Sequence, residues 1–403
     1  MAVKTIIVGD EAALSAALKA ATGETIIKLR VGDYYKVNID GINPAAKVTV
    51  TSFDLVHKTE IDIMFVKNSS NLTFRDLYFH HVEPTNVATG PQVNVFNSRN
   101  ISFIHNEFAG NVDNVNTNDA SGIQVKSSSR VSILDNKFHD LTFASLMSNS
   151  DNLVIAGNDI KKVREGFDFT GVDNVTIDRN IFSKFQPLLT GPRPDHPDGI
   201  QFWTTGSTGS TNVEITNNAF LFGNKVPIQG IFIRSELGDA ARHSDFLIAN
   251  NVYQGQSRHG ITVNDTDGVR ITGNTVVSAP KSGTAQYLDP AINTQNTTGA
   301  EVDHNISALM FSLRDTGRIA HNNVDSWDLK TGVGVKHADL FVAVPTGNSV
   351  PNAFLAKPGS LADILDAGYT QVDRTGNWVS GSASLAVKYL DMLDIAGNAY
   401  QIA

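Results

Sequence analysis

Ionisable residues are concentrated in one short segment that contains two prolines. The segment Arg193-Pro194-Asp195-His196-Pro197-Asp198 carries two carboxylates, an imidazole and a guanidinium. Proline fixes its own φ and restricts the residue before it, so the segment has a constrained backbone. Carboxyl groups and histidine are common general acids and bases, and catalytic groups are often placed on constrained loops. We therefore predict that Asp195, His196 and Asp198 are catalytic; the alternative is a solvated loop whose charges cap a turn.

This segment interrupts a repeat that runs through most of the chain. A nine-residue unit of alternating apolar residues with a late Asn recurs, as in NISFIHNEF (100–108) and NVTIDRNIF (174–182). The shortest regular step is about one coil of a parallel β-helix, and the longest, 38 residues from Asn180 to Asn218, contains the charged segment. We predict that the recurring asparagines form an internal ladder, each amide bonding the backbone of the next coil. They are Asn106, Asn136, Asn158, Asn180, Asn218, Asn251, Asn274, Asn305 and Asn322.

A second strand precedes each unit, as in SGIQVK (121–126), EGFDFT (165–170) and DGIQFW (198–203). Side chains alternate along a strand, so one apolar set should face the interior and the residues between should face outward. The predicted interior set is Ile123, Leu146, Phe167, Ile200, Ile231, Ile261 and Ile292. The predicted outward columns are Ser121, Ala144, Glu165, Asp198, Gln229 and His259; Gln124, Met147, Asp168, Gln201, Phe232, Thr262 and Asn293; and Lys126, Asn149, Thr170, Trp203, Arg234, Asn264 and Gln295. Ionisable and aromatic residues gather in the middle coils, which predicts an exposed groove for a sugar chain.

Both ends of the chain depart from the repeat. Residues 10–21 have helical apolar spacing and an acidic first turn, which predicts a capping helix, and residues 23–35 would form the first strand. The periodicity fades after Asn322, and a short helix is expected around 360–367. The predicted organisation is a cap and first strand at 1–35, a β-helix at 36–330 and a C-terminal cap or tail at 331–403. The predicted fold is all-β, a single right-handed parallel β-helix of about ten coils with an N-terminal capping helix.

Composition restricts the classes of function. The chain has 403 residues, 41% of them hydrophobic, and no cysteine, which excludes disulfides, thiolate metal sites and a cysteine nucleophile. A net charge of −9 argues against nucleic acid as a partner, since phosphate binding needs a basic surface. No apolar run is long enough to span a membrane, and residues 1–7 show no secretory leader. An anionic substrate would have to be bound by a local cluster of Lys, Arg or metal.

The layout of a capping helix, the strand GETIIKLRVGDYY and about ten coils resembles the pectate-lyase-like superfamily of β-helix proteins. This superfamily includes polysaccharide lyases, mannuronan C5-epimerases, polygalacturonases and tailspike depolymerases. The resemblance covers roughly residues 1–330 and implies an extracellular enzyme, a monomer or homo-trimer, that acts on an acidic polysaccharide. Asp195-His196-Pro197-Asp198 resembles the Asp-Pro-His-Asp/Glu signature of the epimerases with His and Pro exchanged and no upstream Tyr. The polygalacturonase motifs are not found.

Three reactions fit these residues. β-Elimination on a uronate comes first because basic and acidic residues occupy neighbouring coils; superfamily lyases use a Lys or Arg base beside acidic calcium ligands. Here Ca²⁺ would be held by Glu165, Asp168 and Asp198. Uronate C5-epimerisation begins with the same abstraction of the C5 proton as β-elimination. Hydrolysis needs a carboxylic acid and a carboxylate, and Glu165, Asp195 and Asp198 resemble the acidic trio of some tailspike glycosidases. The non-catalytic alternative is a β-helix adhesin, which predicts outward columns of Thr, Ser and Asn without a focus.

The candidate site residues fall into three groups. The catalytic candidates are Asp195, His196, Asp198, Arg234, His259 and Lys126; the substrate-binding candidates are Gln201, Trp203, Arg193, Gln229 and Asn264; the metal candidates are Glu165, Asp168 and Asp198. Trp203 would stack on a sugar ring, with plain packing as the alternative. Lys126 could equally be a solvated strand end. His304 and His321 lie beside the asparagine ladder, and we expect them to be structural.

Overall fold

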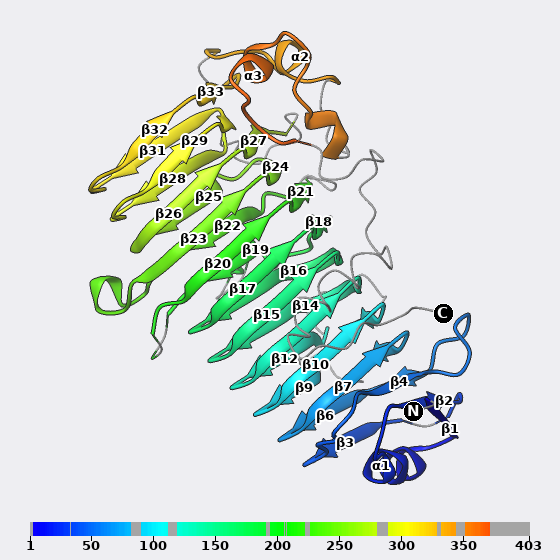
Figure 1. The fold of residues 1–403 in the computed structure, drawn as a ribbon. Helices are drawn as coiled ribbons and strands as arrows, with labels where there is room; N and C mark the ends of the chain where they lie inside the picture. Colours follow the sequence, from blue (N-terminus) through cyan, green and yellow to red (C-terminus); the bar gives the residue numbers. More distant parts are fainter. Residues whose placement is uncertain are drawn as a thin grey trace. The chain divides into compact units, whose positions relative to one another are not determined.

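The computed structural model describes residues 3–32, 34–81, 90–111, 119–190, 194–204, 206, 208–221, 226–279, 289–328, 332–343 and 351–370. These residues form two compact units, one within Met1–Ile160 and the other within Lys161–Trp378. Both units consist mainly of short parallel strands (Figure 1). Across the described residues, no helix combines the length and apolarity needed to cross a bilayer.

The first unit contains two sets of strands. One sheet pairs its strands in parallel in the order β1 (Lys4–Val8), β2 (Thr25–Leu29), β4 (Val48–Ser52), β7 (Ser70–Arg75), β10 (Arg99–Ile104), β13 (Ser129–Leu134) and β15 (Asp151–Ala156). The other set comprises β3 (Lys36–Asp40), β5 (Glu60–Ile61), β6 (Ile63–Lys67), β8 (Tyr78–His80), β9 (Pro91–Phe96), β11 (Glu107–Ala109), β12 (Ser121–Lys126) and β14 (Lys137–Ser148). Neighbours in each sheet come from successive turns of the chain, which is the architecture of a parallel β-helix.

The second unit repeats this arrangement. One parallel sheet runs through β17 (Asp173–Asp178), β20 (Thr211–Thr216), β23 (His243–Ala249), β26 (Thr266–Thr272), β29 (Glu301–Asp303) and β32 (Ile319–His321). The long strands of the other set are β16 (Asp159–Thr170), β19 (Asp198–Phe202), β22 (Gln229–Ile233), β25 (His259–Asn264), β28 (Ala291–Gln295) and β31 (Leu309–Leu313), also parallel. Between them lie β18 (Ile181–Ser183), β21 (Ala219–Leu221), β24 (Val252–Gly255), β27 (Thr275–Ser278), β30 (Ile306–Ser307) and β33 (Val324–Asp325).

The predicted interior column is confirmed in the second unit. Phe167 pairs with Ile200, and the column continues through Ile231, Ile261 and Ile292, all of them buried. Phe182 and Phe220 of the intervening strands stack with centroids 4.7 Å apart, and Phe169 and Phe202 stack at 4.5 Å. Offset or stacked aromatic pairs add to the burial of apolar area, so like residues in successive coils stabilise the repeat.

The prediction for residues 144–149 was wrong by one position. Ile123 pairs with Ser145 and Val125 with Met147, so that Met147 is buried and Leu146 pairs with the outward Gln124. Ala144 is buried as well, and Asn149 lies beyond the end of β14 in a left-handed conformation with φ of 48°. Leu146 and Met147 are both apolar, so alternation alone could not decide which one faces the interior. A slip of one residue exchanges the two faces of a strand.

The asparagine ladder is confirmed in both units. In the first unit, the N–H of Asn106 donates to Oδ1 of Asn136 (2.8 Å), whose own N–H donates to Oδ1 of Asn158 (2.9 Å). Nδ2 of Asn136 also donates to the carbonyl of Phe103 (3.0 Å). In the second unit the same backbone-to-Oδ1 bond links Asn180, Asn218, Asn251, Asn274, Asn305 and Asn323, each at 2.9 Å. The buried turn of each coil is thereby hydrogen-bonded to the next.

The last member of the ladder is Asn323, not Asn322 as the repeat predicted. Asn322 has φ of 51° and occupies the left-handed position that precedes a ladder residue, as Asn217 and Asn250 do with φ of 58° and 57°. Asparagine tolerates this conformation better than most residues because its short side chain bonds locally. The two adjacent asparagines therefore take two different positions of the same turn.

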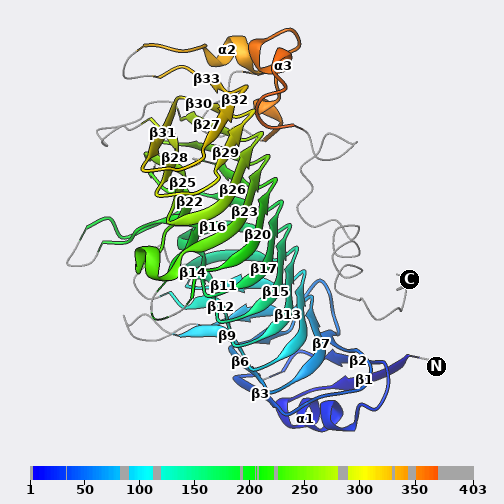
Figure 2. The same cartoon turned by 60° about the vertical axis from the view of Figure 1, so that its left-hand side comes forward.

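Both ends of the described chain are covered by helical segments. Helix α1 (Glu11–Ala20) begins after Asp10, whose carboxylate accepts the N–H of Ala13 (2.8 Å), and buries Leu14 and Leu18. Strand β1 precedes this helix, so the expectation that the strand after it comes first was wrong. In the second unit, α2 (His337–Leu340), the turn Pro351–Phe354 and α3 (Leu361–Ile364) lie near β33 (Figures 1 and 2). Their apolar residues pack on Val252 and Ile306.

We predict that Asn136→Ala destabilises the first unit. The substitution removes the bond that Oδ1 accepts from the N–H of Asn106 and the bond that Nδ2 donates to the carbonyl of Phe103, both in a buried turn, and leaving a buried polar group unsatisfied costs about 1–3 kcal/mol. Urea denaturation should show a free energy of unfolding lower by about 2–5 kcal/mol. Asn38→Ala, at an exposed position of β3, is the control and should change it by less than about 0.5 kcal/mol. Equal effects of the two substitutions would show that the ladder does not carry stability.

Candidate functional site

Three acidic side chains lie together on two neighbouring long strands of the second unit. Glu165 and Asp168 belong to β16, and Asp198 is the first residue of β19. The pairing of Phe167 with Ile200 places Glu165 beside Asp198 in the adjacent coil, and Asp168 pairs with Gln201. Charges of Asp168 and Glu165 act on Asp198, which places the three groups in one electrostatic neighbourhood. We call Glu165, Asp168 and Asp198 the acid cluster.

Glycines next to the cluster bring the coils into close contact. Gly199, Gly230 and Gly260 each follow the first residue of a long strand, and Gly166 follows Glu165 inside β16. A Cβ on Gly166 would collide with the carbonyl oxygen of Gly199, and one on Gly230 with that of Gly260. Only glycine permits this close approach between backbones. The coils therefore hold the first residues of neighbouring long strands close together.

The acid cluster is largely buried, whereas the outward columns predicted that these residues would line an exposed groove. Asp198 is 1% exposed and Asp168 6%, and Glu165 is half-buried. In the part of the chain that the structure describes, both carboxyl oxygens of Asp198 and Oδ1 of Asp168 have no hydrogen-bond partner. Buried polar groups in native proteins are nearly always paired, so unpaired ones need an explanation in function or in a bound group.

Burial and mutual repulsion favour the protonated forms of these acids. Burial raises the pKa of Glu165 to about 8, and the charges of Asp168 and Asp195 act in the same direction. Burial also raises the pKa of Asp168 to about 7. The pKa of Asp198 lies well above its usual range because of burial and then the charges of Asp168 and Glu165. Such shifts are typical of carboxyl groups that act as acids near neutral pH.

Asp195 has a different environment and holds the insertion before β19 in place. Its two oxygens accept from the guanidinium of Arg164 at 2.6 and 2.9 Å, and Oδ2 also accepts the N–H of Leu188 at 2.6 Å. Burial alone would raise the pKa of Asp195, but these hydrogen bonds hold it below its usual range. The sequence analysis missed Arg164, which stands directly before Glu165. The structure thus places Asp195 in a bidentate ion pair.

A polar cavity occupies the other end of the long strands. Its volume is about 480 Å³, and it is lined by Arg234, Ser235, Glu236, Gly238, Asn264, Asp265 and Gln295. Arg234, Asn264 and Gln295 all come from the predicted third outward column. The N–H of Arg234 donates to the carbonyl of Phe202, so Arg234 lies beside half-buried Trp203 of the adjacent coil. Arg234 is exposed, and its Nε lies 3.8 Å from Oε1 of Glu236.

The other candidates of the second unit differ in their burial and in their contacts. Gln201 and Gln229 are half-buried, Gln229 pairs with Asp198, and its Oε1 has no partner among the described residues. His196 is exposed in the insertion. His259 contacts Thr262 Oγ1 through Nδ1 (2.9 Å), and burial, then the charge of Arg258, lowers its pKa.

Two candidates are not among the described residues of the second unit. Lys126 is exposed at the end of β12 in the first unit. Arg193 falls outside the residues that the structure describes.

The acid cluster does not have the spacing of a preformed calcium site. Calcium binds oxygen ligands at 2.3–2.6 Å, so any two ligand atoms of one ion lie within about 5 Å. Within the described ranges, three such atoms lie within 4.8 Å of one another at Glu301, Asp303 and His321, but not at the acid cluster. The predicted ligands Glu165, Asp168 and Asp198 therefore do not form a ready cage in this conformation.

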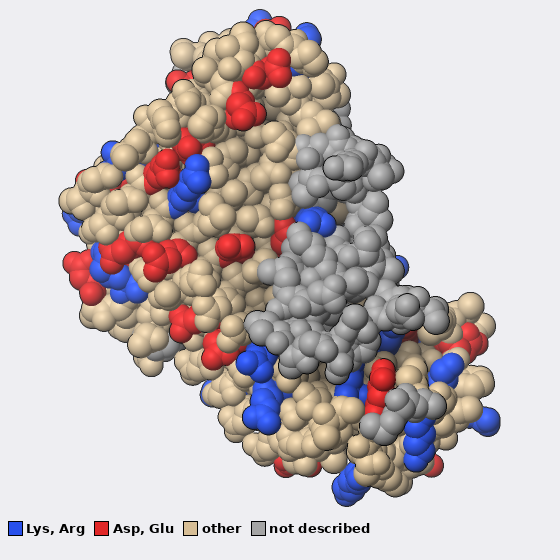
Figure 3. Space-filling view, viewed as in Figure 1, with Lys and Arg blue, Asp and Glu red and all other residues tan. Residues whose placement is uncertain are grey.

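The charged surface is mixed in sign. On the face drawn in Figure 3, Asp and Glu side chains mostly lie close to Lys or Arg side chains and do not form one continuous acidic area. On this face, local groups rather than one large charged area would therefore decide which ligands bind.

Comparisons with known proteins identify the fold. The Dettilon tailspike protein is 14% identical over 81% of this chain and 64% of its own, with a TM-score of 0.51. Pectate lyase C from Erwinia chrysanthemi is 12% identical over 59% and 77%, with a TM-score of 0.38, and a periplasmic alginate epimerase is 13% identical over 76% and 71%, with a TM-score of 0.45. At such identities the likeness concerns the fold alone.

Sequence comparisons agree on the architecture. No curated protein sequence matches the chain significantly. The model of the right-handed β-helix region matches residues 61–220 and 121–306, more than half of the chain. The parallel coils described above are thus those predicted from the repeat, and the chain belongs to the right-handed β-helix family.

Proposed function

We propose that the acid cluster hydrolyses glycosidic bonds in an acidic extracellular polysaccharide. The observation that carries this proposal is a group of three neighbouring carboxyl groups, of which Glu165 is half-buried and Asp168 and Asp198 are buried with oxygens that have no hydrogen-bond partner among the described residues. Such an arrangement costs stability, because desolvated polar groups have lost their water without gaining a partner. Its benefit is chemical, since it keeps a proton available at neutral pH.

Hydrolysis needs one carboxylic acid and one carboxylate on either side of the scissile bond. Glu165 is the proposed proton donor to the leaving oxygen, because it is the most accessible member of the cluster and its pKa is raised to about 8. Asp168, whose pKa of about 7 allows ionisation at neutral pH, is the proposed carboxylate that takes up the proton of water, and Asp198, whose pKa lies well above its usual range, is a second proposed carrier of a proton. Repulsion between close carboxylates prevents all three from ionising together, so the cluster titrates as a unit.

The proposal of an acidic substrate rests on Arg234. Among the described residues that line the cavity, Arg234 is the one basic side chain, beside the acids Glu236 and Asp265, and a guanidinium binds a carboxylate through paired N–H donors. Trp203, at the neighbouring strand end, offers an aromatic face for a sugar ring. Together they would hold a uronate unit at the opposite end of the strands from the acid cluster. Acidic polysaccharides of this kind lie outside the cell, so extracellular localisation is part of the proposal.

β-Elimination is the second candidate, and His259 is the observation that favours it. Its lowered pKa leaves the imidazole neutral and able to accept a proton near pH 7. Elimination and C5-epimerisation also require a cation at the uronate carboxylate, and Arg258, whose charge acts on His259, is the candidate for this role, since Arg234 lies at the other end of the strands. Hydrolysis comes first because the strongest perturbations of pKa lie at the acid cluster.

Glu165→Gln and Asp198→Asn should each lower kcat by about 10²–10⁴-fold. The assay incubates the protein with a panel of acidic polysaccharides and measures new reducing ends together with the ultraviolet absorbance of unsaturated uronates. Hydrolysis gives reducing ends without absorbance, and elimination gives both. Glu214→Gln, an exposed acid on β20, is the matched control and should retain full activity. Full activity in the two cluster variants would refute the assignment of the site.

Arg234→Ala should raise KM for an acidic polysaccharide and leave kcat close to its original value. The reason is that a carboxylate contact far from the reacting bond strengthens binding of the ground state and the transition state alike. Steady-state kinetics at low and moderate salt test this, with Arg99→Ala on the exposed side of β10 as the control. A fall in kcat with unchanged KM would instead place Arg234 at the reacting bond.

Removing the cluster's charge should stabilise the protein above neutral pH. The folded-state pKa of Asp198 lies above its unfolded value, so the folded state binds more protons and stability falls as pH rises through that interval. Asp198→Asn should therefore raise the unfolding temperature at pH 8 by a few degrees, and the gain should shrink below about pH 4. Thermal unfolding followed by circular dichroism measures both. A gain that is independent of pH would contradict a raised pKa.

A further inference from the structure

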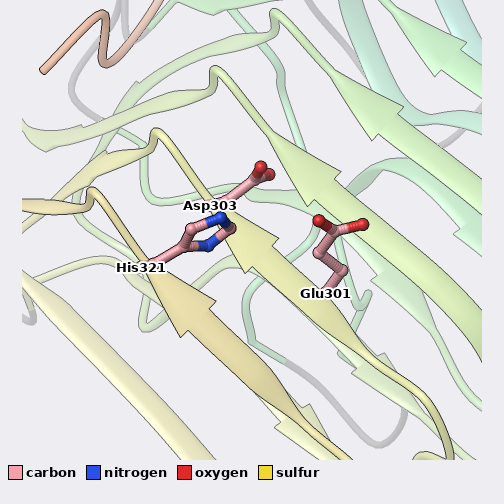
Figure 4. Close-up of side chains that lie close together, drawn as sticks. All are labelled: Glu301, Asp303 and His321. Carbon is pink, nitrogen blue, oxygen red and sulfur yellow. The ribbon is translucent and has the colours of Figure 1, made fainter.

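Three potential metal ligands meet on one face of the last two strands of a sheet in the second unit. Glu301 and Asp303 stand two residues apart on β29, so their side chains point to the same side. Asp303 pairs directly with His321 on β32, the last strand of this sheet in the described chain. One ligand atom from each of the three residues lies within 4.8 Å of the other two. Figure 4 shows the two carboxylates and the imidazole close together.

Asp303 provides a second and independent observation. Its side chain is 2% exposed, and its Oδ1 has no hydrogen-bond partner in the described residues. Oδ2 is occupied, since it contacts Nδ1 of His304 at 3.1 Å and lies 3.5 Å from Nη2 of Arg270, and the carboxyl group also interacts with the side chain of Thr272. A buried carboxylate oxygen without a partner is costly, and a cation would satisfy it. The hydrogen bond from His304 would also orient the carboxylate as outer-shell partners of metal sites do.

We propose that Glu301, Asp303 and His321 form a binding site for a divalent transition metal such as Zn²⁺. An imidazole nitrogen with two carboxylate oxygens suits Zn²⁺ and related ions better than Ca²⁺, which prefers oxygen ligands alone. Three protein ligands leave a fourth position for water. The ion would connect β32, whose residues are all exposed, to β29, and would thereby fix the edge of the sheet. This site is separate from the acid cluster and does not depend on the proposed hydrolysis.

Arg270 is the natural competitor of the metal. Its Nε lies 3.3 Å from Oε2 of Glu301, so its guanidinium contacts both acidic ligands of the site. In the absence of metal this arginine balances part of their charge. A bound cation would repel the guanidinium, which is half-exposed and can turn toward solvent. The arrangement predicts that loss of Arg270 strengthens metal binding.

Isothermal titration of the full-length, chelator-treated protein with ZnCl₂ tests the proposal. His321→Ala should weaken one class of Zn²⁺ binding by about tenfold or more, and Glu301→Gln should do the same. Arg270→Met should tighten that class several-fold. His57→Ala is the matched control, because His57 is an exposed histidine next to a single carboxylate, Asp54, and should leave binding unchanged. CaCl₂ titrated in parallel should bind this site much more weakly.

Thermal unfolding of the same variants gives a readout that does not require activity. Zn²⁺ should raise the unfolding temperature of the original protein and of His57→Ala, but not that of His321→Ala. Both His variants should have similar unfolding temperatures without metal, since both residues are exposed. Zn²⁺ affinity that is equal in the original protein, His321→Ala and Glu301→Gln would overturn the proposal. Weaker binding in Arg270→Met would do so as well.

Discussion

The structure depends on one constraint: each coil must return to the same register as the coil before it, at a turn that water cannot reach. The buried asparagines meet this constraint by bonding backbone groups that would otherwise be unsatisfied. Between these turns the coils differ widely in length, from 18 residues between Asn305 and Asn323 to 38 between Asn180 and Asn218. A fixed turn with variable connections allows a long insertion without disturbing the stacked core. That freedom is what permits a site to be built on an otherwise uniform scaffold.

The acid cluster shows how the scaffold determines chemistry. Parallel pairing brings residues from successive coils side by side, and glycines such as Gly166 and Gly199 allow the backbones to approach closely. Burial raises the pKa of these carboxyl groups, and the charges of neighbouring acids raise those of Glu165 and Asp198 further. The charge of Arg164 opposes this effect at Glu165, but the pKa of Glu165 is still raised. The guanidinium of Arg164 also binds Asp195, and this ion pair holds the insertion in place.

Much of the fold could be predicted from the sequence because two local signals coincide. Alternation of apolar residues gives the faces of the strands, and a recurring Asn marks the turns. The errors fall where one signal is ambiguous, at the adjacent apolar pair Leu146 and Met147 and at the asparagine pair Asn322 and Asn323. The members of the acid cluster were found from the outward columns. Their burial could not be predicted, because it depends on how the coils and the insertion pack together. The sequence of a single strand does not contain that information.

Two features of the sites were beyond the sequence analysis for different reasons. The pair of Arg164 and Asp195 joins residues 31 positions apart through an insertion whose path has no repeat to reveal it. The group of Glu301, Asp303 and His321 did leave a signal, since aligning EVDHN with IAHNN places Asp303 opposite His321. The repeat instead took Asn322 as the ladder residue, which places Asp303 opposite Ala320, and His321 was expected to be structural.

The C-terminal segment has a consequence for the order in which the molecule can be assembled during synthesis. The N–H of Tyr369 donates to Oγ1 of Thr275, 94 residues earlier, and that of Thr370 donates to Oδ1 of Asn250, 120 residues earlier. Coils can add one by one as the chain emerges, because each contacts mainly its neighbours. The coils around β24 and β27, however, must wait for these late residues before their outer edge is closed. Emergence of residues 369 and 370, rather than formation of the repeat, would set the moment at which this part of the protein becomes resistant to proteases.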